Sequence, residues 1–135
     1  MPRPKNVVST KIALYSDDLQ SVLVMYYPGR NIRGLPGGHV EPKENPDEAV
    51  RRELFEELTL SAGEMKRTDF FLRHGTHGAI ILAYTAIVPR DITIVPTDPK
   101  FEYAEWKTKA EIEKSILSAT EYTRFVLENW PKTKA

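Results

Sequence analysis

The most constraining stretch of the sequence runs from Leu35 to Leu60 and joins a Gly-Gly turn to a short helix rich in carboxylates. Asn45 and Pro46 predict the helix start, because Asn is a favoured N-cap and Pro is tolerated at the first helical position. At about 100° per residue, one face of this helix carries Glu53, Glu56 and Glu57. An adjoining apolar stripe is formed by Val50, Leu54 and Leu58. The pattern therefore predicts an amphipathic helix that packs on a core and exposes a carboxylate face beside it.

This acidic face is unfavourable unless something positive occupies it. The three glutamates lie in the last turns, where carboxylates oppose the helix dipole, and residues three and four apart repel one another. Residues 41–57 contain seven acidic and three basic side chains, a local charge of −4. Oxygen ligands suit a hard divalent cation, and Mg²⁺ is the usual choice when a substrate brings phosphates. The alternative is an acidic helix face that is simply exposed to solvent. The Gly-Gly loop attached to this helix makes that alternative less favoured.

The spacing of these residues resembles the Nudix box: Gly, five residues, Glu, seven residues, then Arg-Glu-aliphatic-x-Glu-Glu-x-Gly-aliphatic. Residues 38–60 match in register at Gly38, Glu44, Arg52, Glu53, Leu54, Glu56, Glu57 and Leu60. One position departs, since Thr59 stands where the family has Gly. A left-handed residue is common just past a helix, and a β-branched residue is strained there. The departure concerns the exit of the helix and leaves the expected metal ligands in place.

The resemblance implies a metal site that binds Mg²⁺, with Mn²⁺ as a substitute. The expected ligands are Glu53, Glu56, Glu57, the backbone carbonyl of Gly38 and one acid from residues 98–105. For that last ligand Asp98, Glu102 and Glu105 all stay open, and Glu102 is preferred. The general base would be Glu53, Glu57 or an acid of the same later region.

Other residues of the box and its approach have supporting roles in this hypothesis. Arg52 is expected to orient Glu44 or Glu53. Gly37 and Gly38 would let the backbone come close to metal and phosphate, because they carry no Cβ. Arg30 and Arg33 precede the Gly-Gly turn and are expected to meet substrate phosphate or base, the alternative being solvated loop cations.

Length and composition limit the classes of protein to which this sequence can belong. With 135 residues, 41% apolar and 28% charged, the chain is expected to form a single domain over residues 1–135. The absence of Cys excludes disulfides and thiolate metal sites. Basic and acidic side chains balance at 19 each, so no nucleic-acid partner is expected. No apolar run approaches the ~20 residues of a membrane span, and no signal core is visible, so a cytoplasmic monomer or homodimer is expected.

The remaining sequence predicts strands interleaved with helices. Strands are expected at 7–15, 21–27, 70–74, 78–88, 92–95 and 102–106, after a disordered lead-in at 1–5. A helix is expected at 109–117, and a final helix capped by Thr120 and ended by Pro131 would bury Tyr122, Phe125, Val126 and Trp130. His74 and His77 flank a turn and are expected to be structural or exposed, since two ligands make thin evidence for zinc. This order predicts an α/β fold, and the resemblance implies the same: a Nudix-type α/β/α sandwich with a mixed β-sheet beside a loop-helix-loop motif.

The resemblance implies hydrolysis of a nucleoside diphosphate linked to another moiety. A (deoxy)nucleoside triphosphate or small nucleotide derivative is favoured, because the chain has no long insertion for a larger substrate. An aromatic slot for the base could come from Tyr26, Tyr27, Tyr84 or Phe101. Two alternatives stay open: a ligand-sensing module without catalysis, which would be expected to have lost box glutamates, and an RNA 5′-end pyrophosphohydrolase, which would ordinarily be more basic.

Overall fold

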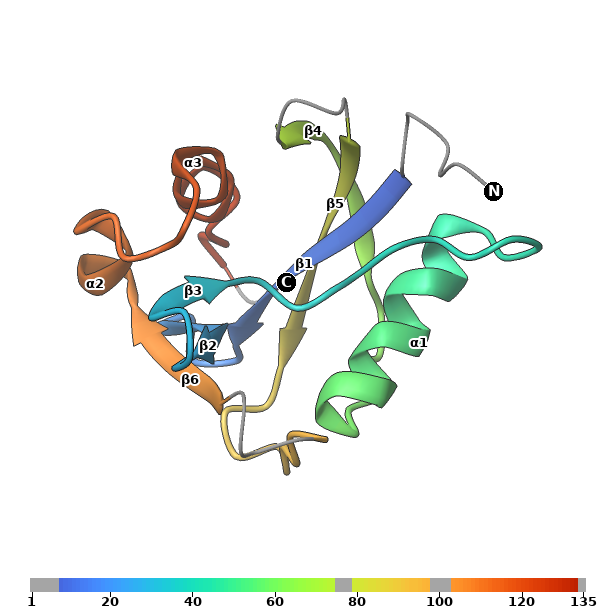
Figure 1. Cartoon of the computed structure of the whole chain (residues 1–135). Helices are drawn as coiled ribbons and strands as arrows, with labels where there is room; N and C mark the ends of the chain where they lie inside the picture. The colour runs from blue at the N-terminus through green and yellow to red at the C-terminus, as the bar shows by residue number, and fades with distance from the viewer. Residues whose placement is uncertain (1–7, 75–78, 98–102, 134–135) are drawn as a thin grey trace.

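The computed structural model describes residues 8–74, 79–97 and 103–133, with the backbone alone for residues 69–74 and 79. Within these ranges the chain forms six strands and three helices (Figure 1). The strands are β1 (Val8–Ser16), β2 (Ser21–Tyr27), β3 (Ile32–Gly34), β4 (Lys66–His74), β5 (Ala79–Val88) and β6 (Tyr103–Thr108). The helices are α1 (Pro46–Leu58), α2 (Lys109–Glu113) and α3 (Thr120–Glu128). None of these helices is long and apolar enough to cross a membrane.

The strands form one mixed sheet in the order β3-β2-β1-β5-β4. β6 lies off this path and also pairs with β2. β1 and β2 pair antiparallel, whereas β1 and β5 pair in parallel from Val8–Ile80 to Ser16–Val88. Beyond β3 the chain continues along the first half of β1, where the Thr10 backbone N–H donates to the Gly38 carbonyl at 2.7 Å. The segment that carries the Gly-Gly turn is therefore held against the central strand.

Two apolar layers cover the two faces of this sheet. One layer joins alternate residues of the strands to α1 and includes Ile12, Leu14, Leu23, Leu54 and Leu58. The other joins the intervening residues to α2 and α3 and includes Ala13, Tyr15, Val22, Phe125 and Val126. Alternation of side chains along a strand produces this division. The predicted α/β/α sandwich is confirmed, and β2 is buried on both faces over most of its length.

The structure corrects several predicted elements. Residues 92–95 form no strand, because Val95 N donates to the Leu58 carbonyl at 3.0 Å and the segment caps the end of α1 instead. α2 ends at Glu113, short of the predicted 117, and Ser115 there has a φ of 58°. The final helix has Ala119 as its N-cap, with Thr120 as its first residue, so the predicted Thr120 cap is wrong by one position.

Two other differences are additions, and one prediction falls outside the described residues. The short strand β3 was not predicted, and β4 begins at Lys66, four residues before the predicted 70. β3 has three residues, too few for a periodic pattern. β4 pairs with β5 with a register shift between Arg67 and Phe71, which interrupts regular pairing in its first half. The lead-in at 1–5 lies outside the described residues.

Thr59 adopts the left-handed conformation that the box glycine would provide. Its φ is 54° and its ψ is 39°, and its backbone N–H donates to the carbonyls of Leu54 and Phe55. The Thr59 hydroxyl donates to the Val95 carbonyl at 3.1 Å. Since a β-branched residue is disfavoured in this region, that side-chain bond and the neighbouring backbone bonds hold the strained exit of α1.

Tyr15 ties the sheet to α3 and gives a test of this packing. Its buried hydroxyl donates to the Val126 carbonyl at 2.7 Å, and burial raises the pKa of the phenol. We predict that Tyr15→Phe lowers the free energy of unfolding by about 1–3 kcal/mol, because the carbonyl loses its buried partner. Denaturant unfolding would measure the change, with Tyr103→Phe at a half-exposed site as the control. Equal stability of both variants would contradict the importance of this link.

Candidate active site

α1 is fixed at its first turn by local capping. The Asn45 side chain accepts from Glu48 N at 2.8 Å, and the Glu48 carboxylate accepts from Asn45 N at 2.9 Å, which is a reciprocal capping box. Tyr84 reaches from β5 and donates its hydroxyl to Asp47 in the same turn. Burial, first of all, and then Asp47 raise the pKa of Tyr84 to about 12. The predicted stripe of Val50, Leu54 and Leu58 is fully buried, so the face that carries the glutamates has a fixed direction.

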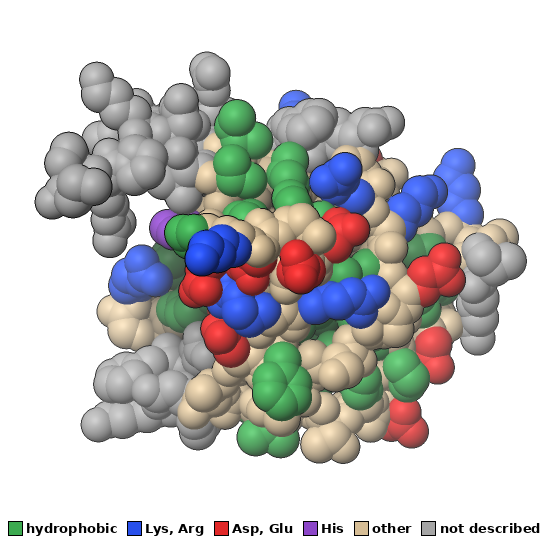
Figure 2. Space-filling model, turned by 90° about the vertical axis from the view of Figure 1, so that its right-hand side faces the viewer, with side chains coloured by type: hydrophobic (Ala, Val, Ile, Leu, Met, Phe, Trp, Pro, Cys, Tyr) green, Lys and Arg blue, Asp and Glu red, His purple; other side chains and the backbone are tan. Residues whose placement is uncertain are grey.

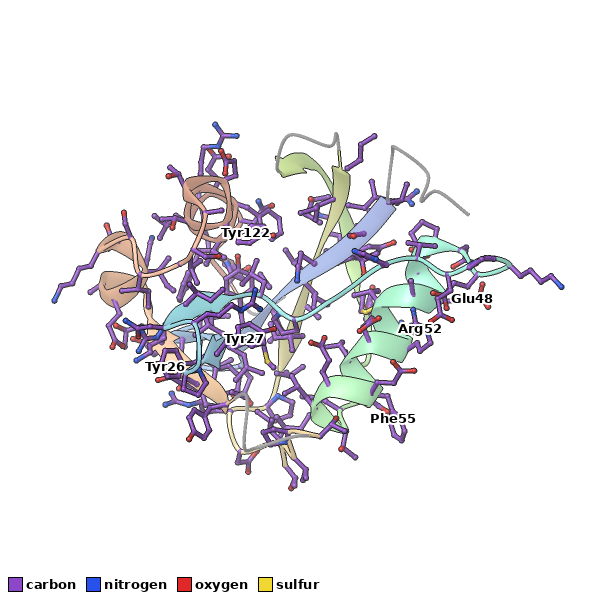
Figure 3. The ribbon with its side chains drawn as sticks, in the orientation of Figure 1. Tyr26, Tyr27, Glu48, Arg52, Phe55 and Tyr122 are labelled. Carbon is purple, nitrogen blue, oxygen red and sulfur yellow. The ribbon has the colours of Figure 1, made fainter. Side chains whose placement is uncertain are left out.

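Arg52 lies among the carboxylates of this face (Figure 3). Its guanidinium binds Glu44 through two hydrogen bonds of 2.7 and 3.0 Å. It also donates to Glu53 at 3.0 Å and to Glu56 at 3.1 Å. The predicted contacts of Arg52 with Glu44 and Glu53 are therefore present. Figure 2 shows the resulting interleaving of acidic and basic side chains on the face that presents α1.

The proton affinities of this cluster follow from the same contacts. The hydrogen bond from Arg52 holds the pKa of Glu44 below its usual value. In return, the hydrogen bond to Glu44 is the main cause that raises the pKa of Arg52. Glu44 and Arg52 therefore stay an ion pair over the whole physiological range, and one guanidinium partly neutralises four carboxylates, since Glu41 also lies 3.7 Å away.

The Gly-Gly loop closes against both β1 and α1. Gly37 has a φ of 136°, and a Cβ there would lie 2.1 Å from the Thr10 carbonyl oxygen. The Gly37 N–H donates to Glu57 at 3.0 Å. A Cβ on Gly38 would lie 2.6 Å from the Glu53 carboxylate. Gly37 is required because its Cβ would meet the backbone of β1, whereas a Cβ on Gly38 would meet only the end of the Glu53 side chain. The predicted approach of these glycines to metal and phosphate stays a prediction.

The Gly38 carbonyl oxygen has partners within the protein. It accepts the Thr10 backbone N–H at 2.7 Å and the Thr10 hydroxyl at 3.2 Å. A carbonyl oxygen has two lone pairs, so a metal would have to displace one of these donors. The role of the Gly38 carbonyl as a metal ligand stays a prediction, and the carboxylates of α1 are the better candidates for metal ligands.

Lys11 is a charged residue near the site that the sequence analysis did not single out. Its ammonium donates to the Leu35 carbonyl at 3.2 Å. Burial lowers the pKa of Lys11, and the charges of Glu57 and Glu53 oppose that change. A lysine in an otherwise uncharged strand, VSTKIALYS, was the available sequence signal.

The donor set on α1 fits a divalent metal in chemistry. Glu53, Glu56 and Glu57 offer carboxylate oxygens from one helix face, as a hard cation prefers. Among the described residues, no three His, Asp or Glu side chains are gathered closely enough to hold a metal as they stand. The reason is visible in the contacts, since Arg52 holds Glu53 and Glu56 while Gly37 holds Glu57. Metal binding would therefore require these carboxylates to rotate away from their present donors.

The two arginines before the loop have protein partners. Arg33 pairs with Glu105 at 3.2 Å and lies over the ring of Tyr26 at 4.5 Å from its centroid. Arg30 lies over the ring of Tyr27 at 5.5 Å. Their substrate contacts stay predictions, because these pairings are with the protein itself.

The later acids and the aromatic slot are only partly described. Asp98 and the preferred Glu102 lie outside the described residues, as do Phe101 and His77. His74 lies at the end of β4, where only the backbone is described. Glu105 pairs with Arg33 and with Lys107 at 3.3 Å. Tyr84 is 1% exposed, which removes it as a platform for a base.

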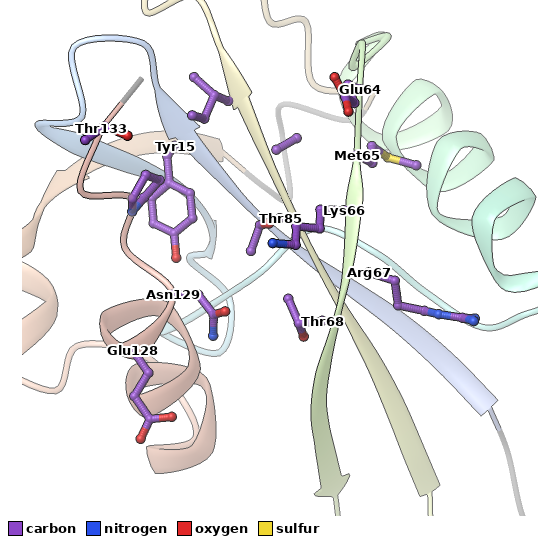
Figure 4. Close-up of a pocket in the computed structure, with 13 residues that line it drawn as sticks. Tyr15, Glu64, Met65, Lys66, Arg67, Thr68, Thr85, Glu128, Asn129 and Thr133 are labelled. Atoms are coloured by element: carbon purple, nitrogen blue, oxygen red, sulfur yellow. The ribbon is translucent and has the colours of Figure 1, made fainter. Parts of the chain in front are cut away.

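An open hollow of about 880 Å³ lies on another part of the molecule (Figure 4). It is bounded by β4, the end of β5 and the chain after α3, with Tyr15, Lys66, Thr68, Thr85 and Asn129 in its lining. None of the predicted site residues lines it. The acidic cluster of α1, and not this hollow, is the candidate active site.

Comparison with known proteins bears on this site. A family model described as the NUDIX domain matches residues 5–126. The chain is similar to the E. coli dihydroneopterin triphosphate pyrophosphohydrolase, at 16% identity over 91% of this chain and 94% of that chain, with a TM-score of 0.77. It is similar to the NUDIX domain of Shewanella oneidensis NrtR complexed with ADP ribose, at 17% identity over 94% and 90% of the two chains, with a TM-score of 0.75.

A MutT NUDIX hydrolase from Burkholderia pseudomallei is also similar, at 22% identity over 93% of this chain and 98% of that chain, with a TM-score of 0.69. A search of curated proteins gave no match. At these identities the likeness to the solved structures shows a shared fold.

The two glycines give different predictions for the size of the stability loss on substitution by alanine. We predict that Gly37→Ala lowers the free energy of unfolding by about 2 kcal/mol or more, because its φ is unfavourable for Ala and its Cβ meets backbone. Gly38→Ala should cost less than about 1 kcal/mol, since the Glu53 carboxylate is the flexible end of a side chain and can move. Thermal or denaturant unfolding of both variants would measure the difference. Equal losses would contradict the described path of the loop.

Proposed function

Because the chain belongs to the Nudix family, we propose that it is a metal-dependent hydrolase of a phosphoanhydride bond in a nucleoside diphosphate linked to another moiety. One observation carries this proposal most directly. Three glutamates of the matched box lie on one face of α1, beside a loop whose glycines touch two of them. Such a carboxylate set can neutralise phosphate charge through a divalent cation, which is the main requirement of phosphoryl chemistry.

A (deoxy)nucleoside triphosphate or small nucleotide derivative is the proposed substrate class. The similar structures include MutT proteins, a dihydroneopterin triphosphate pyrophosphohydrolase and an Ap4A hydrolase. The names of these proteins support a nucleotide derivative as substrate without selecting its base.

The residues of the site have distinct proposed tasks. Glu53, Glu56 and Glu57 would hold Mg²⁺, or Mn²⁺ in its place. Bound metal would neutralise charge on the phosphates and make water more acidic. A carboxylate oxygen of Glu53, Glu57 or an acid from residues 98–105 would accept the proton of the attacking water. Arg52 would keep Glu44 oriented, as its present hydrogen bonds do, and would release the carboxylates that take up the metal.

Binding without hydrolysis is the competing function. One similar structure is a NUDIX domain complexed with ADP ribose, so a nucleotide-binding module would use the same fold. Retention of every glutamate of the box favours hydrolysis. A cytoplasmic location, and a monomeric or homodimeric state, complete the proposal.

Glu57→Gln gives the direct test of catalysis. The variant should lose metal-dependent turnover of a panel of nucleoside triphosphates, ADP ribose and dinucleoside polyphosphates by about 100-fold or more, a size typical for a group that acts in the transition state. Its fold should persist, since Gln can still accept the Gly37 N–H. Release of phosphate, pyrophosphate and nucleotide would be scored with Mg²⁺, with Mn²⁺ and with a chelator.

Glu113→Gln, on the exposed side of α2, removes the same charge away from the site and serves as the control. Wild-type-like turnover by Glu57→Gln, or full turnover in the chelator, would contradict the assignment. If wild type cleaves no compound with either metal, the binding function takes its place.

A further inference from the structure

Lys11 is the charged side chain that the proposed chemistry leaves unused. It is the one charged residue in β1, and it is half-buried between fully buried neighbours. A lysine ammonium carries three N–H donors. Within the described residues, the Leu35 carbonyl at 3.2 Å is the hydrogen-bond acceptor seen for it.

The direction of Lys11 follows from strand alternation. Ile12 and Leu14 belong to the apolar layer under α1, whereas Ala13 and Tyr15 belong to the layer under α2 and α3. Lys11 shares its side of β1 with Ala13 and Tyr15. Its acceptor Leu35 belongs to that same layer. Lys11 therefore faces the side of the sheet opposite to α1.

The Gly-Gly loop lies against both Lys11 and the carboxylates of α1. A Cβ on Gly37 would lie 2.9 Å from the Lys11 Cα, so the loop passes directly over this residue. The Gly37 N–H in turn donates to Glu57 at 3.0 Å. Burial lowers the pKa of Lys11, and the negative charges of Glu57 and Glu53 oppose that change. A group lying along this loop would thus have carboxylates on one side and an ammonium on the other.

The charge balance at Lys11 depends on what those carboxylates bind. Burying a cation is costly unless opposite charge compensates it. In the protein alone, Glu57 and Glu53 supply that negative charge. If they hold a divalent cation, as proposed, their negative potential at Lys11 is reduced, and an anion beside the ammonium becomes favourable. A polyphosphate chain would bring anionic oxygens to this place.

We infer that Lys11 is a substrate-binding residue whose ammonium contacts phosphate oxygens of the bound nucleotide, from the side of the Gly-Gly loop opposite to α1. The inference rests on the proposed function, because it takes a nucleotide polyphosphate as the ligand. It also adds a substrate preference to that function. With the Lys11 ammonium as a second cationic contact beside the proposed metal, ligands with several phosphates are favoured over nucleosides and monophosphates.

The test compares Lys11→Met with Lys11→Arg and with Lys66→Met. Met keeps the length of the side chain and removes its charge, whereas Arg keeps the charge. Lys66 is an exposed lysine of β4 that lines the separate hollow, so its variant controls for loss of charge on the sheet (Figure 4). Thermal unfolding of each variant would show that the fold is kept.

Calorimetry with Mg²⁺ would measure the dissociation constants of the α,β-methylene analogues of ATP and dGTP, and of the matching nucleosides. Lys11→Met should weaken the tighter-binding analogue about tenfold or more, because a charge-assisted hydrogen bond is lost. Its melting temperature and its affinity for the nucleosides should stay those of wild type. Lys11→Arg should keep most of the affinity for the analogue, and Lys66→Met should keep all of it.

Two results would overturn the inference: unchanged affinity of Lys11→Met for the analogues, or equal losses for analogue and nucleoside, which would indicate a structural role. The result is separable from the proposed function. If wild type hydrolyses nucleotides and Lys11→Met binds them normally, the hydrolase stands and the role of Lys11 fails. If wild type binds the analogues through Lys11 and hydrolyses nothing, the role of Lys11 stands and the hydrolase fails.

Discussion

The crowding of carboxylates on one face of α1 is the constraint on which the site depends. Three glutamates in the last turns repel each other and oppose the helix dipole. The protein tolerates this arrangement through a small number of donors. Arg52 holds Glu44, Glu53 and Glu56 with hydrogen bonds of 2.7–3.1 Å, and the Gly37 N–H holds Glu57 at 3.0 Å. Because these donors are polar and partly exposed, a more strongly charged cation can replace them.

The rest of the fold holds α1 and the Gly-Gly loop in place when a cation replaces these donors. α1 is fixed by its buried stripe, by its capping box and by Tyr84 from β5. The loop is fixed by Thr10, whose N–H and hydroxyl both bind the Gly38 carbonyl. Glycine at 37 is required because the loop lies on the backbone of β1. Helix and loop are therefore positioned independently against the sheet, and the carboxylates lie where the two meet.

Local chemistry explains which features could be predicted from the sequence. The start of α1, its apolar stripe and the contacts of Arg52 depend on residues within a few turns of one another, so spacing was sufficient. The left-handed exit at Thr59 followed from its place just past the helix. By contrast, β3 is too short, at three residues, to show a periodic pattern. The irregular segment after Pro89 and the pairing of Arg33 with Glu105 depend on partners distant in sequence. Lys11 was missed for the same reason, since only the folded loop brings it beside Gly37 and the carboxylates.

The most direct measurement is the anomalous scattering of Mn²⁺ in crystals of the protein grown with Mn²⁺ and a non-hydrolysable nucleotide. The account predicts at least one strong anomalous peak among the carboxylate oxygens of Glu53, Glu56 and Glu57. Arg52 should then retain Glu44 while its contact with Glu56 is broken. Crystals with an ordered nucleotide but no peak on α1, or with Mn²⁺ bound only elsewhere, would contradict the assignment of this helix as the metal-binding element.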